Sequence, residues 1–366
     1  MAFDFDDMEA EAAARLEAGE DDDTVRLALG GVEAPGAWKG GLIPPMRNAG
    51  MQGREHLPAR KDLPTYLPPA LAPPEWESGF ARVRLFAFSG AGDSVNLWLA
   101  CTPFLPDWLD VAWFEAPGHG MRKTEPIPES VEELAKEAFD AISGVLMEHC
   151  KDGALEGAPF ALLGHSMGAQ VMASVAVLCK KKLGLEPVCL FAVDRGAPHL
   201  KLYTEEGYKL LCMDEPVEFF TGFMPLVAKL LLDPKRSPEH ERIIRMWQRD
   251  LRSSQEHVWA KGHHIFHCDI HVFRAVGNFA MDEAIKSGKK FEQDLMTWHE
   301  INCRITSSGS ESSAVWSWES YDEWAEWTTE KCQVHNIEAS HDGVKCHEAT
   351  WKAIVSALGK HAGQTS

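Results

Sequence analysis

The sequence predicts an α/β fold in which a mostly parallel central sheet is flanked by helices. From about residue 82 onward, short apolar segments alternate with longer amphipathic segments, as strands and helices do in this class. The short segments are apolar on both faces, which is expected of strands that are covered by helices on both sides. A Gly-x-Ser-x-Gly motif stands between one such segment and an apolar helical segment, which places it at the carboxyl edge of the sheet.

Seven short segments, apolar or rich in β-branched residues, are expected to form strands. They are residues 82–89, 109–114, 160–163, 188–193, 269–276, 301–306 and 333–337. Helices are expected at residues 130–147, 167–178 and 347–358. The first helix should begin with a capping box, because Glu133 follows Ser130 by three positions.

The chain is expected to divide at about residue 80. Residues 1–80 begin with an acidic stretch and continue with many prolines, so they are predicted to form an extended arm or linker. Residues 81–366 are the predicted α/β domain. Within it, residues 200–262 show helical patterning without a clear strand, and they are predicted to be a helical insertion where a lid would lie.

Composition narrows the classes of function. The 366 residues include 45% hydrophobic and 25% charged residues, the mixture of an ordinary globular protein. The formal net charge of −19 argues against a nucleic-acid partner, because binding phosphates needs clustered lysine and arginine. No apolar run approaches the roughly 20 residues of a membrane span. No signal or transit peptide is evident either. A cytoplasmic location is therefore expected, with an organelle as the alternative. The nine cysteines lack CxxC spacing and suit free thiols.

The motif at residues 164–168 (GHSMG) predicts a nucleophilic serine. A nucleophile of this kind stands on a sharp turn between a strand and a helix, where small glycines let the turn close. Ser166 would then face a cleft, with the amino end of the following helix directed at the negative charge that develops during reaction.

A serine nucleophile needs a base, and in this order of elements the base follows the last strand. His341 lies in the expected loop between the last strand and the final helix. His335 falls within that strand and His347 at the start of that helix, so His341 is the predicted base.

The acid that orients the base is less constrained by the sequence. Asp194 ends the strand that follows the nucleophile's strand, from which a carboxylate can reach the imidazole. The turn after the next-to-last predicted strand offers Glu311, and Asp282 lies upstream of it. Asp194 is preferred, with Glu311 and Asp282 as alternatives.

A group of histidines with one cysteine follows the predicted lid: His263, His264, His267, Cys268 and His271. A helix would bring several of them to one face, as a zinc site requires. Residues 269–276, however, alternate as a strand does and would scatter these side chains. Neither a metal nor a cofactor is expected.

Four blocks between residues 82 and 360 resemble the type II thioesterases of polyketide and nonribosomal peptide assembly lines, a group related to the medium-chain fatty acyl carrier-protein hydrolases. The blocks are LFAFSGAG (85–92), EAPGHGMR (115–122), GHSMGA (164–169) and APHL (197–200). The resemblance implies an α/β-hydrolase fold with a helical lid, and an oxyanion hole formed by the backbone N–H groups of Met167 and Ala91.

Two departures from that family bear on the site. Ser89-Gly90 stands where the family usually has Pro-His before the oxyanion alanine. The family's late GxxD turn is matched by residues 309–312, where Ser312 occupies the aspartate position. Related domains that terminate assembly lines carry their acid at the place of Asp194.

The resemblance implies a serine thioesterase that works through an acyl-enzyme on Ser166. Its substrate would be an acyl thioester of carrier-protein phosphopantetheine or of CoA, and its role would be to edit or release acyl chains. A carboxylesterase or lipase acting on oxygen esters is the rival within the fold. A non-catalytic scaffold is the rival outside it.

Overall fold

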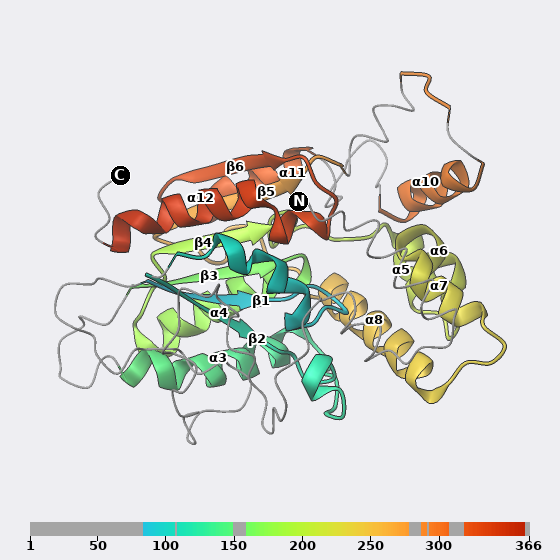
Figure 1. Cartoon of the computed structure of the whole chain (residues 1–366), viewed down its shortest axis with the longest axis horizontal. Helices are drawn as coiled ribbons and strands as arrows, with labels where there is room; N and C mark the ends of the chain where they lie inside the picture. Colours follow the sequence, from blue (N-terminus) through green and yellow to red (C-terminus); the bar gives the residue numbers. More distant parts are fainter. Residues whose placement is uncertain are drawn as a thin grey trace.

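A computed structural model describes residues 83–106, 108–148, 159–277, 287–290, 293–306 and 318–362. Its centre is a parallel sheet of six strands in the order β2-β1-β3-β4-β5-β6 (Figure 1). The strands are β1 (Val83–Phe88), β2 (Leu109–Phe114), β3 (Phe160–His165), β4 (Cys189–Val193), β5 (Asp269–Ala275) and β6 (Cys332–Ile337). The predicted α/β-hydrolase class is therefore confirmed.

Helices cover both faces of this sheet, which explains why the strands are apolar at successive positions. On one face, Phe86 and Leu162 pack in a core with α3 (Val131–Glu148) and α4 (Met167–Leu183). On the other face, neighbouring residues such as Leu85 and Leu163 pack with α12 (Glu348–Gly359). Successive side chains of a strand point to opposite faces, so each strand contributes to both cores.

Short 3-10 helices connect several of these elements. They are η2 (Val95–Phe104), η3 (Gly120–Arg122), η4 (Glu323–Trp327), η5 (Gly343–Cys346) and η6 (Lys360–Ala362). The predicted helix at 130–147 begins as expected, because the Ser130 hydroxyl accepts a hydrogen bond from the Glu133 N–H at 3.2 Å.

The expected strand at residues 301–306 is wrong, because this segment ends helix α10 (Gln293–Thr306). Ile301 and Ile305 lie four positions apart and therefore share one helix face. They pack closely against Gly222 and Gly207 of neighbouring helices, where a β-carbon would meet atoms of the isoleucines at 2.3 and 2.6 Å. The next-to-last strand is consequently β5, and the turn that follows it begins at Val276 rather than at residue 307.

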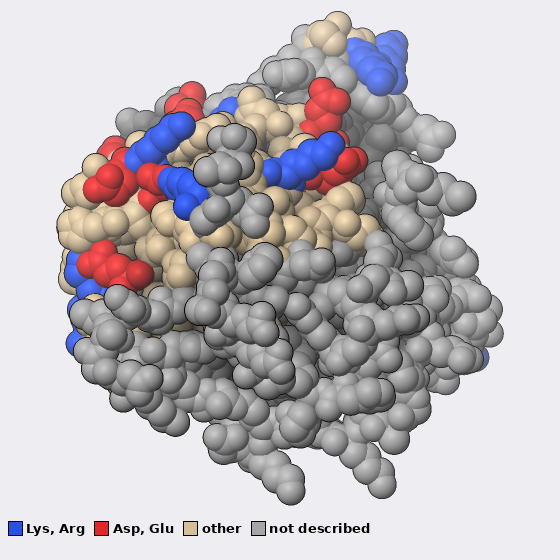
Figure 2. Space-filling view, turned by 60° about the vertical axis from the view of Figure 1, so that its left-hand side comes forward, with Lys and Arg blue, Asp and Glu red and all other residues tan. Residues whose placement is uncertain are grey.

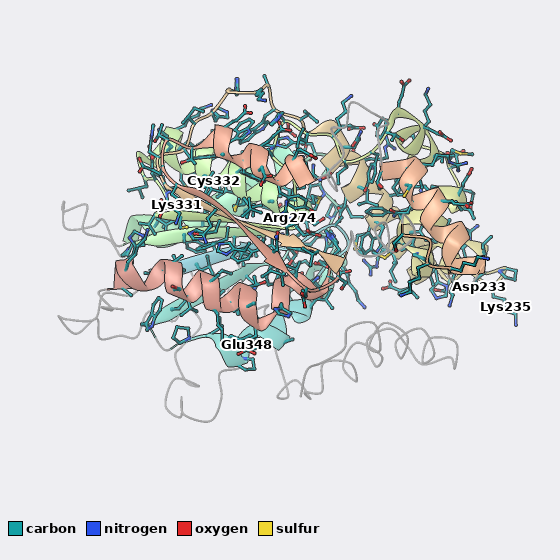
Figure 3. All side chains as sticks on the ribbon, turned by 90° about the horizontal axis from the view of Figure 1, so that it is seen from above. Asp233, Lys235, Arg274, Lys331, Cys332 and Glu348 are labelled. Atoms are coloured by element: carbon teal, nitrogen blue, oxygen red, sulfur yellow. The ribbon has the colours of Figure 1, made fainter. Side chains whose placement is uncertain are left out.

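The predicted lid segment, residues 200–262, contains four helices. They are α5 (Glu205–Leu211), α6 (Val217–Phe223), α7 (Pro225–Leu232) and α8 (Pro238–Glu256). Helix α10, which comes from a later part of the chain, joins α5, α6 and α7 in a group at one end of the molecule (Figure 1). Asp233 and Lys235, in the turn between α7 and α8, lie at the extremity of this group (Figure 3).

The described surface carries charges of both signs. On the face shown in Figure 2, lysine and arginine side chains are interspersed with aspartate and glutamate. Among the described residues, no helix combines the length and the apolar character needed to cross a membrane. The predicted arm, residues 1–80, lies outside the described residues.

We expect Gly168→Ala to destabilise the fold, because the backbone of helix α4 packs directly against the backbone at the end of strand β1. A β-carbon at Gly168 would lie 2.2 Å from the carbonyl oxygen of Phe88, so the backbone would have to move. A loss of about 1–3 kcal/mol in the free energy of unfolding is expected from urea titration. Gly262→Asn is the control, because Gly262 has a positive φ that asparagine tolerates and open space around it. Equal stabilities of the two variants would contradict this account.

Candidate active site

Ser166 occupies a strained turn between β3 and α4. Its φ of 52° lies in the left-handed region that residues other than glycine rarely adopt, and such strain is concentrated at functional sites. Gly164 makes the turn possible, because a β-carbon there would lie 2.1 Å from the carbonyl oxygen of Gly168. The Ser166 N–H donates to the carbonyl oxygen of Val193 at 2.9 Å, which fastens the turn to the end of β4.

Asp194 directly follows β4 and is completely buried. Its φ of 46° is the other positive value among the described non-glycine residues. One carboxylate oxygen, Oδ1, accepts from the Ala275 N–H at 2.9 Å and from the Tyr321 hydroxyl at 2.8 Å. The second oxygen, Oδ2, lies 2.7 Å from Nδ1 of His341. The carboxylate is therefore fixed by strand β5 and by Tyr321 in an orientation that presents Oδ2 to the imidazole.

His341 lies between β6 and η5, as the sequence predicts. Burial lowers its pKa, but the hydrogen bond and charge of Asp194 and the charge of Asp342 outweigh that effect, so the pKa is raised above its usual value. Its side chain is 26% exposed, whereas that of Asp194 is not exposed at all. The imidazole is thus held at Nδ1 from inside the protein while part of the ring remains accessible.

No sequence pattern indicated Tyr321, which donates to Asp194, or Arg274, which lies beside the Tyr321 ring. Tyr321 belongs to α11 (Trp318–Asp322), and the guanidinium of Arg274 on β5 lies 5.8 Å from the centre of its ring. Arg274 also donates to the Asn336 side chain on β6 at 2.9 Å. Figure 3 shows Arg274 on the sheet, near the group formed by α5, α6, α7 and α10.

The loop after β1 brings the predicted oxyanion residue Ala91 close to Ser166. A β-carbon on the preceding Gly90 would lie 3.2 Å from the β-carbon of Ser166. Met167 is the first residue of α4, so its N–H is among those that an α-helix leaves without a partner within the helix. Both predicted donors therefore belong to backbone segments that flank Ser166.

Helix α8 holds the same loop in place through Gly92. The Gly92 N–H donates to Oδ2 of Asp250 at 2.8 Å. Trp247, one turn earlier on α8, lies against the loop, and a β-carbon on Gly92 would fall 2.0 Å from its ring. The position of α8 and the conformation of this loop are consequently linked.

His119 shares the Asp250 carboxylate. Its Nε2 lies 2.8 Å from Oδ2 of Asp250 and its Nδ1 lies 2.9 Å from the carbonyl oxygen of Pro117. Both partners accept hydrogen bonds, so the ring is an imidazolium with two donating N–H groups. Burial opposes this charge, but the carboxylate of Asp250 outweighs it and raises the pKa of His119 to about 9.

A buried cluster of charges connects the loop after β1 with the loop of His341. The ammonium of Lys345 lies 2.7 Å from Oδ2 of Asp93 and 3.1 Å from Oδ1 of Asp342. His165 joins the cluster, with its Nε2 2.9 Å from the carbonyl oxygen of His341. Asp93, His165 and Asp342 are spaced as a metal site could be, but the ammonium of Lys345 already bonds both carboxylates.

The remaining sequence candidates lie elsewhere. Glu311 and Asp282, the alternative acids, fall outside the described residues. His335 pairs with His271 across strands β5 and β6, with 2.9 Å between Nε2 and Nδ1. His347 caps helix α12, because its side chain accepts from the Ala349 N–H.

Raising the pH should weaken the fold through His119. Because its pKa in the folded protein is raised to about 9 from 6.5, its contribution is complete below pH 6.5 and is lost as the pH rises to about 9. This loss amounts to about 3 kcal/mol in the free energy of unfolding. Asp250→Asn should remove that part of the pH dependence in urea titrations, whereas Asp214→Asn, on the surface of the same segment, should retain it. A pH dependence that survives in Asp250→Asn would contradict the pairing.

Lys345→Met should destabilise the protein by about 3–5 kcal/mol, because it leaves the buried carboxylate of Asp93 and the partly exposed carboxylate of Asp342 without their cation. Lys352→Met is the matched control, since Lys352 is 73% exposed in an ion pair with Glu348. That exposed pair should contribute less than about 1 kcal/mol. Equal unfolding free energies for the two variants would show that the buried cluster contributes little.

Comparison with known proteins identifies the family. The model of the thioesterase domain matches residues 83–356. The medium-chain S-acyl fatty acid synthase thioesterase of Anas platyrhynchos is 29% identical over 198 residues, which cover 53% of this chain and 73% of that protein. Linear gramicidin dehydrogenase LgrE of Brevibacillus parabrevis is 32% identical over 175 residues, which cover 47% of this chain and 60% of that protein.

Solved structures share the fold. RedJ, a thioesterase of the prodiginine pathway of Streptomyces coelicolor, aligns with a TM-score of 0.51 at 20% identity, covering 77% of this chain and 92% of RedJ. The family model spans most of the chain, from β1 to within α12, and includes Ser166, Asp194 and His341. The chain therefore belongs to the thioesterase family and is a thioester hydrolase.

Proposed function

We propose that Ser166, His341 and Asp194 form a catalytic triad that hydrolyses acyl thioesters of carrier-protein phosphopantetheine or of CoA. The observation that carries this proposal is the 2.7 Å contact between Nδ1 of His341 and Oδ2 of Asp194. That contact fixes the proton on Nδ1, which leaves Nε2 as the basic nitrogen. The strained turn of Ser166 supports the role of its hydroxyl as the nucleophile.

The reaction proceeds in two halves. His341 takes the proton of the Ser166 hydroxyl as Oγ attacks the thioester carbonyl carbon, and the oxyanion is held by the N–H groups of Met167 and Ala91. The C–S bond then breaks, the thiol leaves with the proton from His341, and an acyl-serine ester remains. Water, deprotonated by His341, attacks this ester and releases the free acid and Ser166.

Asp194 supports the charge that His341 acquires in both halves. Its carboxylate already accepts hydrogen bonds from the Ala275 N–H and the Tyr321 hydroxyl, so it does not need to reorient during the reaction. The raised pKa of His341 predicts that kcat/KM falls below a midpoint that lies above pH 6.5. Carboxylate and imidazole thus act together as one base.

Two observations support the proposed substrate class: the apolar side chains of the helices in the predicted lid segment, and the known relatives of this chain. Apolar side chains of helices α5, α6 and α7 belong to the same hydrophobic cluster as one face of the sheet. They include Phe219, Phe220 and Val227. Such apolar surroundings suit the binding of an acyl chain. The duck relative is a medium-chain fatty acid synthase thioesterase, and RedJ is a thioesterase of the prodiginine biosynthetic pathway. We therefore assign this chain the release or editing of acyl chains bound to a carrier thiol.

Asp194→Asn should lower kcat by about 10⁴-fold with octanoyl-pantetheine, because an amide favours the wrong imidazole tautomer. Glu311→Gln and Asp282→Asn, the alternative acids, should stay within a few-fold of the unmodified protein. The melting temperature of each variant is measured as well, so that a loss of folding is not taken for a loss of catalysis. A severe loss in Glu311→Gln or Asp282→Asn with little loss in Asp194→Asn would place the acid elsewhere.

A covalent probe tests the nucleophile separately. A sulfonyl fluoride should add one adduct to the protein, detected by intact mass, and Ser166→Ala should abolish it. Rates with octanoyl-pantetheine are compared with those of the matched octanoyl oxygen ester. A clear preference for the oxygen ester would favour the carboxylesterase alternative.

A further inference from the structure

Arg195, the residue after Asp194, carries a buried cationic side chain. Its side chain is 1% exposed, and Nη1 donates to the Ser254 hydroxyl at 3.3 Å. Nε and Nη2 are fully buried and have no hydrogen-bond partner in the part of the chain that the structure describes. No described carboxylate forms an ion pair with this guanidinium. Three of its five N–H groups, one on Nε and two on Nη2, therefore have no acceptor among the described residues.

Burial of this charge is costly, and buried charges in proteins are normally paired. Burial lowers the pKa of Arg195 to about 10, so the side chain is still a cation at neutral pH. The hydroxyls of Tyr203 and Tyr321 favour its charged form but are themselves neutral at that pH. An anion bound next to the guanidinium would remove the unfavourable energy.

The Tyr203 hydroxyl is a second unused donor in the same region. It is buried and has no hydrogen-bond partner among the described residues. Its ring lies edge-on to Phe219 and Phe223 of α6, and Gln255 of α8 accepts from its backbone N–H at 2.9 Å. Burial raises the pKa of this hydroxyl well above its usual range, so it remains an O–H donor.

Both groups lie between the proposed triad and the helices of the predicted lid segment. Arg195 is covalently next to Asp194, and its partner Ser254 lies on α8. The Ser254 hydroxyl in turn donates to the side chain of Gln170, which is one helical turn after Ser166 on α4. Arg195 is thus connected through Ser254 and Gln170 to the helix that begins directly after Ser166.

We propose that Arg195 and Tyr203 form a buried subsite for a carboxylate carried on the acyl chain of the substrate. Two N–H groups of the guanidinium can bind both oxygens of a carboxylate, and the tyrosine hydroxyl supplies a third hydrogen bond. This inference rests on the proposed function and narrows its substrates to acyl thioesters with an acidic group away from the thioester. Plain saturated acyl chains would leave the cation unpaired.

The test compares pairs of pantetheine thioesters of equal chain length, one with a terminal carboxylate and one without. Across a series of lengths, the unmodified protein should show, at its best length, a kcat/KM about 10–100-fold higher for the carboxylate member. Arg195→Met should abolish this ratio, and Tyr203→Phe should reduce it by about 2–10-fold. Arg252→Gln, an exposed arginine on α8 paired with Glu256, is the control and should keep the ratio.

Stability provides a second readout. Methionine fills a similar volume without a buried charge, so Arg195→Met should fold and melt at a temperature equal to or above that of the unmodified protein. A free dicarboxylic acid of the best length should raise the melting temperature of the unmodified protein but not that of Arg195→Met. An equal rise with acetate or inorganic phosphate would identify a site for small free anions and overturn the proposal.

The outcomes separate this inference from the proposed function. An unchanged ratio in a folded Arg195→Met protein, with both thioesters still hydrolysed, would overturn the subsite and leave the thioesterase activity intact. If the unmodified protein hydrolyses neither thioester, the proposed function fails, and the melting experiment alone decides whether the carboxylate site exists.

Discussion

The buried carboxylate of Asp194 is the contact on which the proposed chemistry depends. Its two oxygens join elements that are distant in sequence: the end of β4, the backbone of β5 through Ala275, helix α11 through Tyr321, and the loop of His341. A charge with no exposure is costly unless hydrogen bonds replace its contacts with water, and the Asp194 carboxylate has such bonds on both oxygens. The same hydrogen bonds that stabilise the buried carboxylate therefore also fix its orientation. The orientation of the His341 ring is fixed in turn, because its Nδ1 bonds this carboxylate.

Around this contact, the site is assembled from loops that two further polar groups hold together. Lys345 joins the loop after β1 to the loop of His341 through Asp93 and Asp342. Asp250 joins the loop after β1 to helix α8. The Lys345–Asp93 contact is buried and the other two are partly buried, so these contacts are shielded from solvent and misplacing them is costly. The loops that carry the proposed oxyanion donor and the proposed base are thus held in place by Lys345 and by Asp250 of helix α8.

The sequence predicted the sheet well because buried parallel strands are apolar at successive positions, and it placed Asp194 and His341 at loop positions that the fold brings to 2.7 Å. It failed at residues 301–306, where a short apolar run considered alone resembles a strand, although Ile301 and Ile305 share a helix face. The contacts of Tyr321 with Asp194 and of Lys345 with Asp93 were not predicted, because these partners lie 127 and 252 positions away. Contacts of that separation depend on the complete topology, which local patterns do not contain.

The hydrogen bond from Gly92 to Asp250 has a thermodynamic consequence for how this enzyme selects among substrates. One carboxylate on α8 holds the loop that carries the proposed oxyanion donor, and α8 also carries Ser254 beside Arg195. In the proposed subsite, binding of the acyl chain beside Arg195 and binding of the oxyanion near Ala91 would then be coupled through one helix. Such coupling is reciprocal, so an acyl chain that stabilises this placement of α8 also favours oxyanion binding, and to the same degree. Discrimination between acyl chains would then arise partly in the rate of acyl transfer to Ser166 and not only in the affinity for the substrate.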